Sequence, residues 1–290
     1  MRNLASVNHS AKSDKYSLEQ HEYSQLKTHH DKKNKIGWLY MIGMPRPYFT
    51  PQLLNDISYY HQQVQHEMEI SEQSQYDYVV FASDESSIFS LGKDLELIYQ
   101  LIKQQNKELL SRYAKNCISL IHQHLTHLNS DLTTVSLVQG DALSSGFELA
   151  LSTDIIVAER GAKFGFPEVL YNSFPSMSLL NRRVSIEVAE NIMLSGQLFT
   201  AEALYEMGII DILAEKGEGE LELFKFIKGQ NEAAKQQLIL RKVKDVCHPI
   251  SYQELYRIAE IWVDTLLNSS PKDLRMMQRF IMRQSKPLAS

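Results

Sequence analysis

Four short apolar runs separated by long helical stretches constrain the fold of this chain more than any other feature. The runs are rich in the β-branched and aromatic residues that strands favour, and they occupy residues 36–42, 76–82, 133–138 and 155–158. Strands that alternate with helices form parallel sheets with right-handed crossovers. We therefore predict an α/β fold, followed by a mostly helical part from Ser176 onward.

Capping signals and apolar periodicity predict where the helices lie. Thr50 is a candidate N-cap with Pro51 at the first helical position, and residues 95–129 have a long helical pattern. A helix is expected to start near Gly146, directly after the third strand. Pro271 follows two serines and is expected to open a final helix.

Composition divides the chain into three predicted parts. Residues 1–35 are polar and lack periodicity, so we expect an N-terminal tail or a loosely docked arm. Residues 36–215 are expected to form the α/β core, and residues 216–290 an α-helical C-terminal region. The 43% hydrophobic content is sufficient for a substantial core.

Charge and cysteine usage exclude several classes of protein. The formal net charge of -5 comes with scattered Lys and Arg, which gives no basis for nucleic-acid binding. No run approaches the ~18 apolar residues of a membrane span, and the first residues are polar, unlike a secretory signal. Cys117 and Cys247 are too isolated for a disulfide framework or a zinc site. We expect a cytoplasmic protein in a reducing compartment.

Glu148 and Glu168 are the strongest candidates for catalytic residues. Each lies in apolar sequence, one at the start of a predicted helix and the other after a segment punctuated by Gly and Pro. Carboxylates are rarely buried unless something pairs with them or uses them. The alternative is that both are solvated glutamates at the ends of elements. Because they occur as a pair, we favour an acid/base pair facing a closed pocket.

Two glycine-containing turns could supply backbone amides for an anion. Residues 89–95 form a predicted strand–loop–helix turn around Gly92, and residues 144–147 lead into the helix that carries Glu148. Unpaired amides at a helix N-terminus bind anions, and two such turns together would form an oxyanion hole. The turns can converge only if the strands at 79–82 and 133–138 are neighbours in one sheet.

A metal site is not expected. His122, His124 and His127 lie in a helical stretch, but their spacing differs from the i, i+4 pair of a zinc-binding helix.

Three segments resemble, in order, motifs of the crotonase (enoyl-CoA hydratase/isomerase) superfamily. Residues 89–95 resemble its first oxyanion segment, residues 138–150 its second oxyanion segment with the first catalytic glutamate, and residues 164–169 the segment of the second glutamate. The resemblance extends from about residue 36 to residue 285. It implies an α/β spiral of ββα units with an α-helical C-terminal region.

Within this superfamily the sequence is most similar to bacterial diffusible signal factor synthases. The similarity lies in residues 158–161, 167–175, 259–263 and 271–274, and in the long helical insertion after Asp94. It implies dehydration of a 3-hydroxyacyl chain on acyl carrier protein, followed by thioester hydrolysis, to give a cis-2-unsaturated fatty acid quorum-sensing signal.

The resemblance also implies the site residues and the partners. Glu168 would remove the α-proton, Glu148 would protonate the leaving hydroxyl, and the amides of Lys93 and Ser145 would bind the thioester oxygen. The expected substrate contacts are Gly92, Gly146, Phe147, Met177 and Trp262. The resemblance implies no cofactor beyond the phosphopantetheine of the carrier protein or CoA, and it implies a homo-oligomer, by analogy a trimer, with a sensor protein as a possible partner.

The sequence departs from the family pattern at two places and leaves alternatives open. Ser144-Ser145-Gly146 replaces a glycine-rich run, and Pro175-Ser176-Met177-Ser178 replaces Pro-Gly-Met-Gly. If the Ser145 position requires a positive φ, serine adds strain there. The alternatives are an enoyl-CoA hydratase or isomerase that retains its thioester, and a catalytically silent acyl-binding protein. For the synthase we expect a blind apolar cavity between the glutamates, walled by Trp262 and residues 274–282.

Overall fold

The larger sheet forms the centre of the protein. The computed structural model describes residues 22–43, 47–71, 73–173, 177–229 and 232–285. Within them this sheet has the strand order β1-β2-β3-β5-β7-β10, antiparallel between β1 and β2 and parallel elsewhere. Its strands are β1 (Leu26–Asp31), β2 (Ile36–Met41), β3 (Tyr78–Ser83), β5 (Thr133–Val138), β7 (Ile155–Glu159) and β10 (Ile212–Ala214).

A second, smaller sheet is made of very short strands. Its order is β4-β6-β8-β9, and its strands are β4 (Ile88–Ser90), β6 (Asp141–Leu143), β8 (Lys163–Gly165) and β9 (Leu198–Thr200). Each of β3, β5 and β7 is followed directly by a strand of this smaller sheet and then by helical chain. This repeat confirms the predicted spiral of ββα units.

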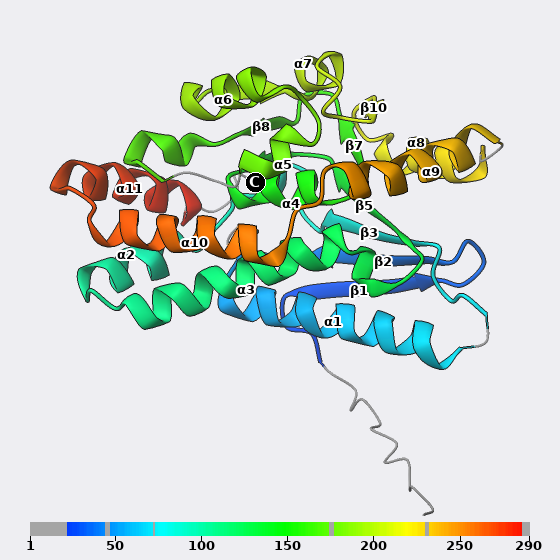
Figure 1. Ribbon diagram of the computed structural model, residues 1–290, viewed down its shortest axis with the longest axis horizontal. Coiled ribbons are helices and arrows are strands. Elements are labelled where there is room, and N and C mark those ends of the chain that lie inside the picture. Colours follow the sequence, from blue (N-terminus) through cyan, green and yellow to red (C-terminus); the bar gives the residue numbers. More distant parts are fainter. Residues whose placement is uncertain (1–21, 44–46, 72, 174–176, 230–231, 286–290) are drawn as a thin grey trace, which may run out of the picture.

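Helices surround the two sheets (Figure 1). They are α1 (Pro51–Ile70), α2 (Leu95–Lys103), α3 (Lys107–Leu125), α4 (Ser145–Ser152), α5 (Met177–Asn181), α6 (Ile186–Ser195), α7 (Ala201–Glu206), α8 (Gly219–Lys228), α9 (Glu232–Cys247), α10 (Tyr252–Leu267) and α11 (Pro271–Gln284), with 3-10 turns η1 (His127–Asn129) and η2 (Pro167–Tyr171). None of the helices in the described ranges is long and apolar enough to cross a bilayer.

The predicted helix starts are confirmed by their caps. The Thr50 hydroxyl accepts a hydrogen bond from the Leu53 amide, and Pro51 opens α1. Ser270 and Asp273 form a capping box at the start of α11. The long helical pattern of residues 95–129 is two helices rather than one, because Gln105 adopts a left-handed φ of 52° and Asn106 caps α3.

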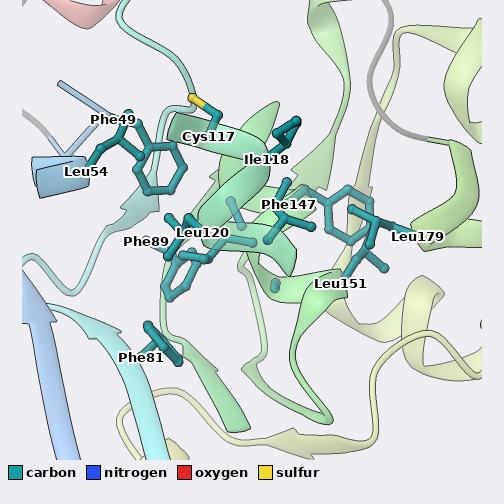
Figure 2. Close-up of a cluster of buried hydrophobic side chains, with 14 of the residues drawn as sticks. Phe49, Leu54, Phe81, Phe89, Cys117, Ile118, Leu120, Phe147, Leu151 and Leu179 are labelled. Carbon is teal, nitrogen blue, oxygen red and sulfur yellow. The ribbon is translucent and has the colours of Figure 1, made fainter. Parts of the chain in front are cut away.

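Helix α3 crosses the centre of the core. Figure 2 shows its Cys117, Ile118 and Leu120 among the aromatic rings of Phe89 and Phe147, which come from β4 and α4. All five side chains are buried. The packing joins the two oxyanion segments to one apolar cluster, so their relative position depends on the core.

The C-terminal helices return to this same region. α10 packs along α3, and α11 packs against α2 and η2 (Figure 1). The last two helices therefore cover the segments that carry Lys93 and Glu168, although they are remote from both in sequence.

The structure corrects one predicted boundary. Residues 26–31 belong to the edge strand β1 and not to a polar tail. The strand could not be recognised from the sequence because its side chains are mostly polar. Backbone hydrogen bonds to β2 stabilise this edge strand without an apolar face. The C-terminal half also contains β9 and β10, each three residues long and too short to show a periodicity. Residues 1–21 lie outside the described part of the chain.

Candidate active site

The two predicted oxyanion turns converge. β3 pairs with β5, and β4 pairs with β6, so the turns that follow β4 and β6 are neighbours. A Cβ on Gly92 would lie 2.5 Å from Ser144 Cβ, and one on Gly146 would lie 2.6 Å from the Ser90 carbonyl oxygen. Glycine at both positions therefore allows a backbone approach that a side chain would block.

Two backbone amides at this junction are available as donors. No hydrogen bond from the amide of Lys93 or Ser145 is found among the described residues. The amides on either side of Lys93 are used: that of Gly92 donates to Ser90 Oγ and that of Asp94 to Tyr113 Oη. Ser145 is the first residue of α4, where amides have no intrahelical acceptor. Two such donors without an acceptor are what an oxyanion hole requires.

Backbone strain lies at Ser144, one residue before the position considered in the sequence. Ser144 has φ 54° and ψ -126°, whereas Ser145 is not among the residues of positive φ. Such a conformation costs a non-glycine residue about 1–3 kcal/mol. The condition for strain at Ser145 is therefore not met, and the positive φ lies at Ser144 instead.

Glu148 is buried and ion-paired. Glu148 is 4% exposed, and its Oε2 accepts hydrogen bonds from Lys93 Nζ at 3.0 Å and from Ser145 Oγ at 2.6 Å. An ammonium and a hydroxyl on one oxygen both favour the ionised carboxylate. The side chains of Lys93 and Ser145 thus contact Glu148, whereas the sequence pointed only to their amides.

Glu168 has the opposite environment. It lies in the first turn of η2, is 2% exposed, and neither carboxyl oxygen has a hydrogen-bond partner among the described residues. Burial raises the pKa of Glu168 to about 7, against the lowering effects of the Lys93 charge and the nearby Ser144 hydroxyl. Near neutral pH this carboxyl group therefore exists in both its protonated and ionised forms.

The two environments define complementary proton-transfer roles. Dehydration starts with Glu168 as base and Glu148 as acid, as the family resemblance implies. The contacts favour the opposite protonation states, with the proton on Glu168 and the negative charge on Glu148. These are the states at the start of hydration and at the end of dehydration. A base and an acid exchange roles between the two directions of one reaction, so both remain consistent with the geometry.

The cavity beside these residues is small. It measures about 10 Å³ and is lined by Lys93, Ser144, Tyr171, Ser173, Trp262, Met277 and three leucine or isoleucine side chains. This volume holds about one water molecule. Among the described residues, this cavity is therefore too small for the predicted apolar tunnel.

Trp262 forms part of that wall. It is 6% exposed, its Nε1 donates to Ser173 Oγ at 2.8 Å, and Lys93 Nζ lies 5.4 Å from its ring centroid. The side chain thus contacts the site, as the sequence suggested. Met277 of α11 lies on the same cavity.

Two other predicted substrate contacts have different surroundings. The Phe147 ring is fully buried, stacked on Phe166 at 5.0 Å and edge-on to Phe164 at 5.2 Å. It anchors α4 in the core, and its role as a substrate contact remains a prediction. Met177 is partly buried at the start of α5 and does not line the cavity beside Lys93.

Two positioning residues escaped the sequence analysis. Tyr113 Oη donates to the Phe49 carbonyl at 2.7 Å while accepting the Asp94 amide. Gln284 Nε2 donates to the carbonyls of Leu91 and Lys93, and its Oε1 accepts the Leu95 amide. These contacts hold the first oxyanion turn from α3 and α11. No local pattern marks a glutamine at the end of an amphipathic helix as a partner of a turn near residue 93.

A second cavity lies elsewhere in the described part of the chain. It measures about 440 Å³ at the amino-terminal ends of β3, β5 and β7, and its charged lining includes His127, Asp154, Arg182 and Asp245. Several of these groups pair with one another, as Arg182 does with Asp245 and His127 with both aspartates. We place the chemistry at the two glutamates, where buried acids and free amides meet. In the described ranges no group of three or more His, Cys, Asp or Glu could hold a metal ion.

Comparison with known proteins identifies the family. Residues 51–250 match the Enoyl-CoA hydratase/isomerase family, and the chain belongs to it. Enoyl-CoA hydratase EchA19 of Mycobacterium tuberculosis is 31% identical over 147 residues, covering 48% of this chain and 54% of that protein. A probable peroxisomal enoyl-CoA hydratase of Arabidopsis thaliana is 36% identical over 87 residues, covering 29% and 33%. The chain thus matches from a third to about half of the length of these curated relatives.

Solved structures share the whole fold at low identity. An enoyl-CoA hydratase/isomerase from Xanthobacter autotrophicus Py2 superposes with a TM-score of 0.72 over 91% of this chain and 96% of its own, at 17% identity. Human mitochondrial delta3-delta2-enoyl-CoA isomerase gives 0.73 over 89% and 97%, at 15% identity. These likenesses concern the fold.

Proposed function

We propose that this protein adds water to, and removes it from, the Cα–Cβ bond of an acyl thioester, with Glu148 and Glu168 as its acid/base pair. The observation that carries the proposal is the contrast between the two buried carboxyl groups: one is ion-paired with Lys93, and the other is desolvated with its pKa near 7. Lys93 and Ser145, which contact Glu148 through their side chains, also have amides without an acceptor among the described residues. A pair of acids with opposite charge states is what proton exchange at two carbons requires.

The geometry supports a concrete reaction in the hydration direction. The Glu148 carboxylate takes a proton from water as the water oxygen bonds to Cβ. The double-bond electrons move toward the thioester oxygen, where the amides of Lys93 and Ser145 stabilise the developing enolate. Such donors contribute roughly 3–4 kcal/mol each in other enzymes. Glu168 then gives its proton to Cα, and the reverse sequence is dehydration.

A more specific function is signal synthesis. In this form the enzyme dehydrates a 3-hydroxyacyl group on acyl carrier protein and then directs water to the thioester carbonyl, releasing a cis-2-unsaturated fatty acid. The motif resemblance around residues 167–175 supports it, as does the burial of the site under α10 and α11. The simpler alternative is an enzyme that keeps its product as a CoA thioester.

One experiment separates these functions. The protein is incubated with 3-hydroxyacyl and 2-enoyl chains of about ten to fourteen carbons, each on CoA and on acyl carrier protein, and the products are identified by mass spectrometry. Free 2-enoic acid supports the synthase. An enoyl or hydroxyacyl thioester without free acid supports the hydratase. Tight binding without turnover on either carrier would contradict the enzymatic proposal and favour an acyl-binding protein.

The acyl chain-length preference tests whether Trp262 forms part of the wall of the acyl-binding cavity. Trp262→Phe keeps an aromatic ring but removes the donor to Ser173, and its smaller side chain enlarges the cavity. We expect its preferred acyl chain to become longer, while Tyr256→Phe on the same helix serves as a control, since Tyr256 does not line this cavity. An unchanged preference would place the acyl chain elsewhere.

A further inference from the structure

The Lys93 side chain occupies the active site itself. Only 13% of it is exposed, Nζ lies 3.0 Å from Glu148 Oε2, and the ammonium lies 5.4 Å from the Trp262 ring centroid. Ammonium groups are rarely buried without a purpose or a partner, because desolvation is costly. The turn that exposes the Lys93 amide therefore also delivers a cation beside the first glutamate.

The charges of this cluster are interdependent. Burial opposes the charge on Lys93, but the nearby carboxylates of Glu148 and Glu168 outweigh it and raise the pKa of the ammonium. With Lys93 protonated and Glu148 ionised, a proton on Glu168 makes the buried trio neutral. Loss of that proton leaves a net negative charge in an apolar site, which is unfavourable. The cation thus determines where the single shared proton resides.

Other titratable groups near the trio keep their protons. The Cys117 thiol of α3 and the Tyr171 phenol of η2 act electrostatically on Lys93 and Glu168. Burial raises the pKa of Cys117 to about 12 and that of Tyr171 well above its usual value. Near neutral pH the charge distribution is therefore set by Lys93 and the two glutamates.

Without the Lys93 cation, Glu148 and Glu168 would no longer differ in protonation state. Two neighbouring carboxyl groups in a buried site share one proton, because both cannot ionise together. Ser145 Oγ donates to the same Oε2 that Lys93 contacts, and a hydroxyl alone supplies no charge. We propose that the Lys93 ammonium is a positioning residue that holds Glu148 as the carboxylate and leaves Glu168 as the acid. This inference rests on the proposed two-carboxylate function.

A charge readout tests the proposal without relying on turnover. Carboxyl carbons of glutamate are labelled with carbon-13, signals are assigned with Glu148→Gln and Glu168→Gln, and NMR titrations are compared for the wild type and Lys93→Met. We expect the wild type to keep Glu148 ionised while Glu168 titrates near neutrality. In Lys93→Met, which keeps the backbone amide, both signals should shift together as they share one proton. A Glu148 signal that is unchanged in Lys93→Met would overturn the proposal.

Kinetics give an independent comparison on the 2-enoyl thioester. Lys93→Met should lower kcat by about 10–100-fold with KM changed less than about threefold, since a positioning contact acts on the transition state. Propylammonium, which matches the missing atoms, should partly restore kcat in Lys93→Ala. Lys107→Met is the matched control, because Lys107 pairs with Asp264 on the surface. Full activity of Lys93→Met with a wild-type pH profile would contradict the positioning role of the Lys93 ammonium. An inactive wild type would contradict only the proposed function, and the NMR titration would then decide whether Lys93 has this role.

Discussion

The side-chain amide of Gln284 donates a 2.9 Å hydrogen bond to the backbone carbonyl of Lys93. The same side chain also contacts the carbonyl of Leu91 and the amide of Leu95. A residue at the end of the last helix thus fixes the turn that presents both the Lys93 amide and the Lys93 ammonium. The C-terminal region is part of the catalytic architecture through this contact.

Replacement of Gln284 should therefore impair catalysis more than folding. We expect Gln284→Leu to lower kcat by about tenfold or more, because a small displacement of a positioned donor reduces the rate strongly. The control is Gln278→Leu on the exposed side of α11, where the side chain donates a hydrogen bond to the Tyr99 hydroxyl. Equal activity of both variants would show that the contact does not position the turn.

Replacement of either glutamate should reduce activity to a similar extent, but the two variants should differ in stability. Glu148→Ala and Glu168→Ala should each reduce turnover by about 10²–10⁴-fold, the usual contribution of proton transfer. Glu148→Ala also leaves the buried Lys93 ammonium unpaired, which costs about 3–5 kcal/mol. Glu168→Ala removes an acid that has no hydrogen-bond partner among the described residues, so its loss should be smaller. Urea unfolding of both variants measures the difference, and equal losses would mean that the Lys93 pair is not a significant interaction.

Ionisation of Glu168 should make stability fall as pH rises. Its folded pKa of about 7 exceeds the ordinary glutamate value of 4.5. The contribution of protonated Glu168 to the free energy of unfolding is therefore fully present below about pH 4.5. It is lost as pH rises through about 7, in total roughly 3 kcal/mol. Glu168→Gln should flatten this part of the curve in urea unfolding between about pH 5 and 8. A wild-type slope retained in Glu168→Gln would assign it to other groups.

Ser144→Gly should stabilise the protein. Ser144 holds a positive φ, and glycine adopts this region without a Cβ penalty, so we expect a gain of about 1 kcal/mol. Ser145→Gly should instead lower activity, because it removes the hydroxyl that donates to Glu148. Thermal unfolding and kcat measured on both variants test the assignment. A more stable Ser145→Gly together with a destabilised Ser144→Gly would reverse it.

Two buried histidines should make the fold acid-sensitive. His61 Nδ1 contacts Gln123 and His124 Nδ1 contacts Ser152, while both Nε2 atoms lack partners among the described residues. Burial lowers the pKa of His61 from 6.5 to about 4. This contribution to stability is present above about pH 6.5 and is lost as pH falls toward 4. His61→Leu should reduce that acid-side slope in urea unfolding, and an unaltered slope would exclude His61 as its source.

Local sequence patterns determined the main strands, the helix caps and both catalytic candidates. The apolar runs became β2, β3, β5 and β7 because continuous apolar sequence and strand propensity act within a few residues. The Gly92 turn and the start of α4 were predicted for the same reason, since glycine and helix N-termini have local signatures. The edge strand β1 and the three-residue strands were missed because partners elsewhere in the chain stabilise them.

Only the tertiary structure decided what each side chain does in the site. The sequence placed Lys93 and Ser145 there as amides, and folding brought Lys93 Nζ and Ser145 Oγ to the same oxygen of Glu148. It likewise brought Gln284 to the Lys93 turn and left Glu168 without a hydrogen-bond partner among the described residues. Burial, ion pairing and pKa depend on distances between segments that are far apart in sequence, and close packing of the complete chain sets those distances.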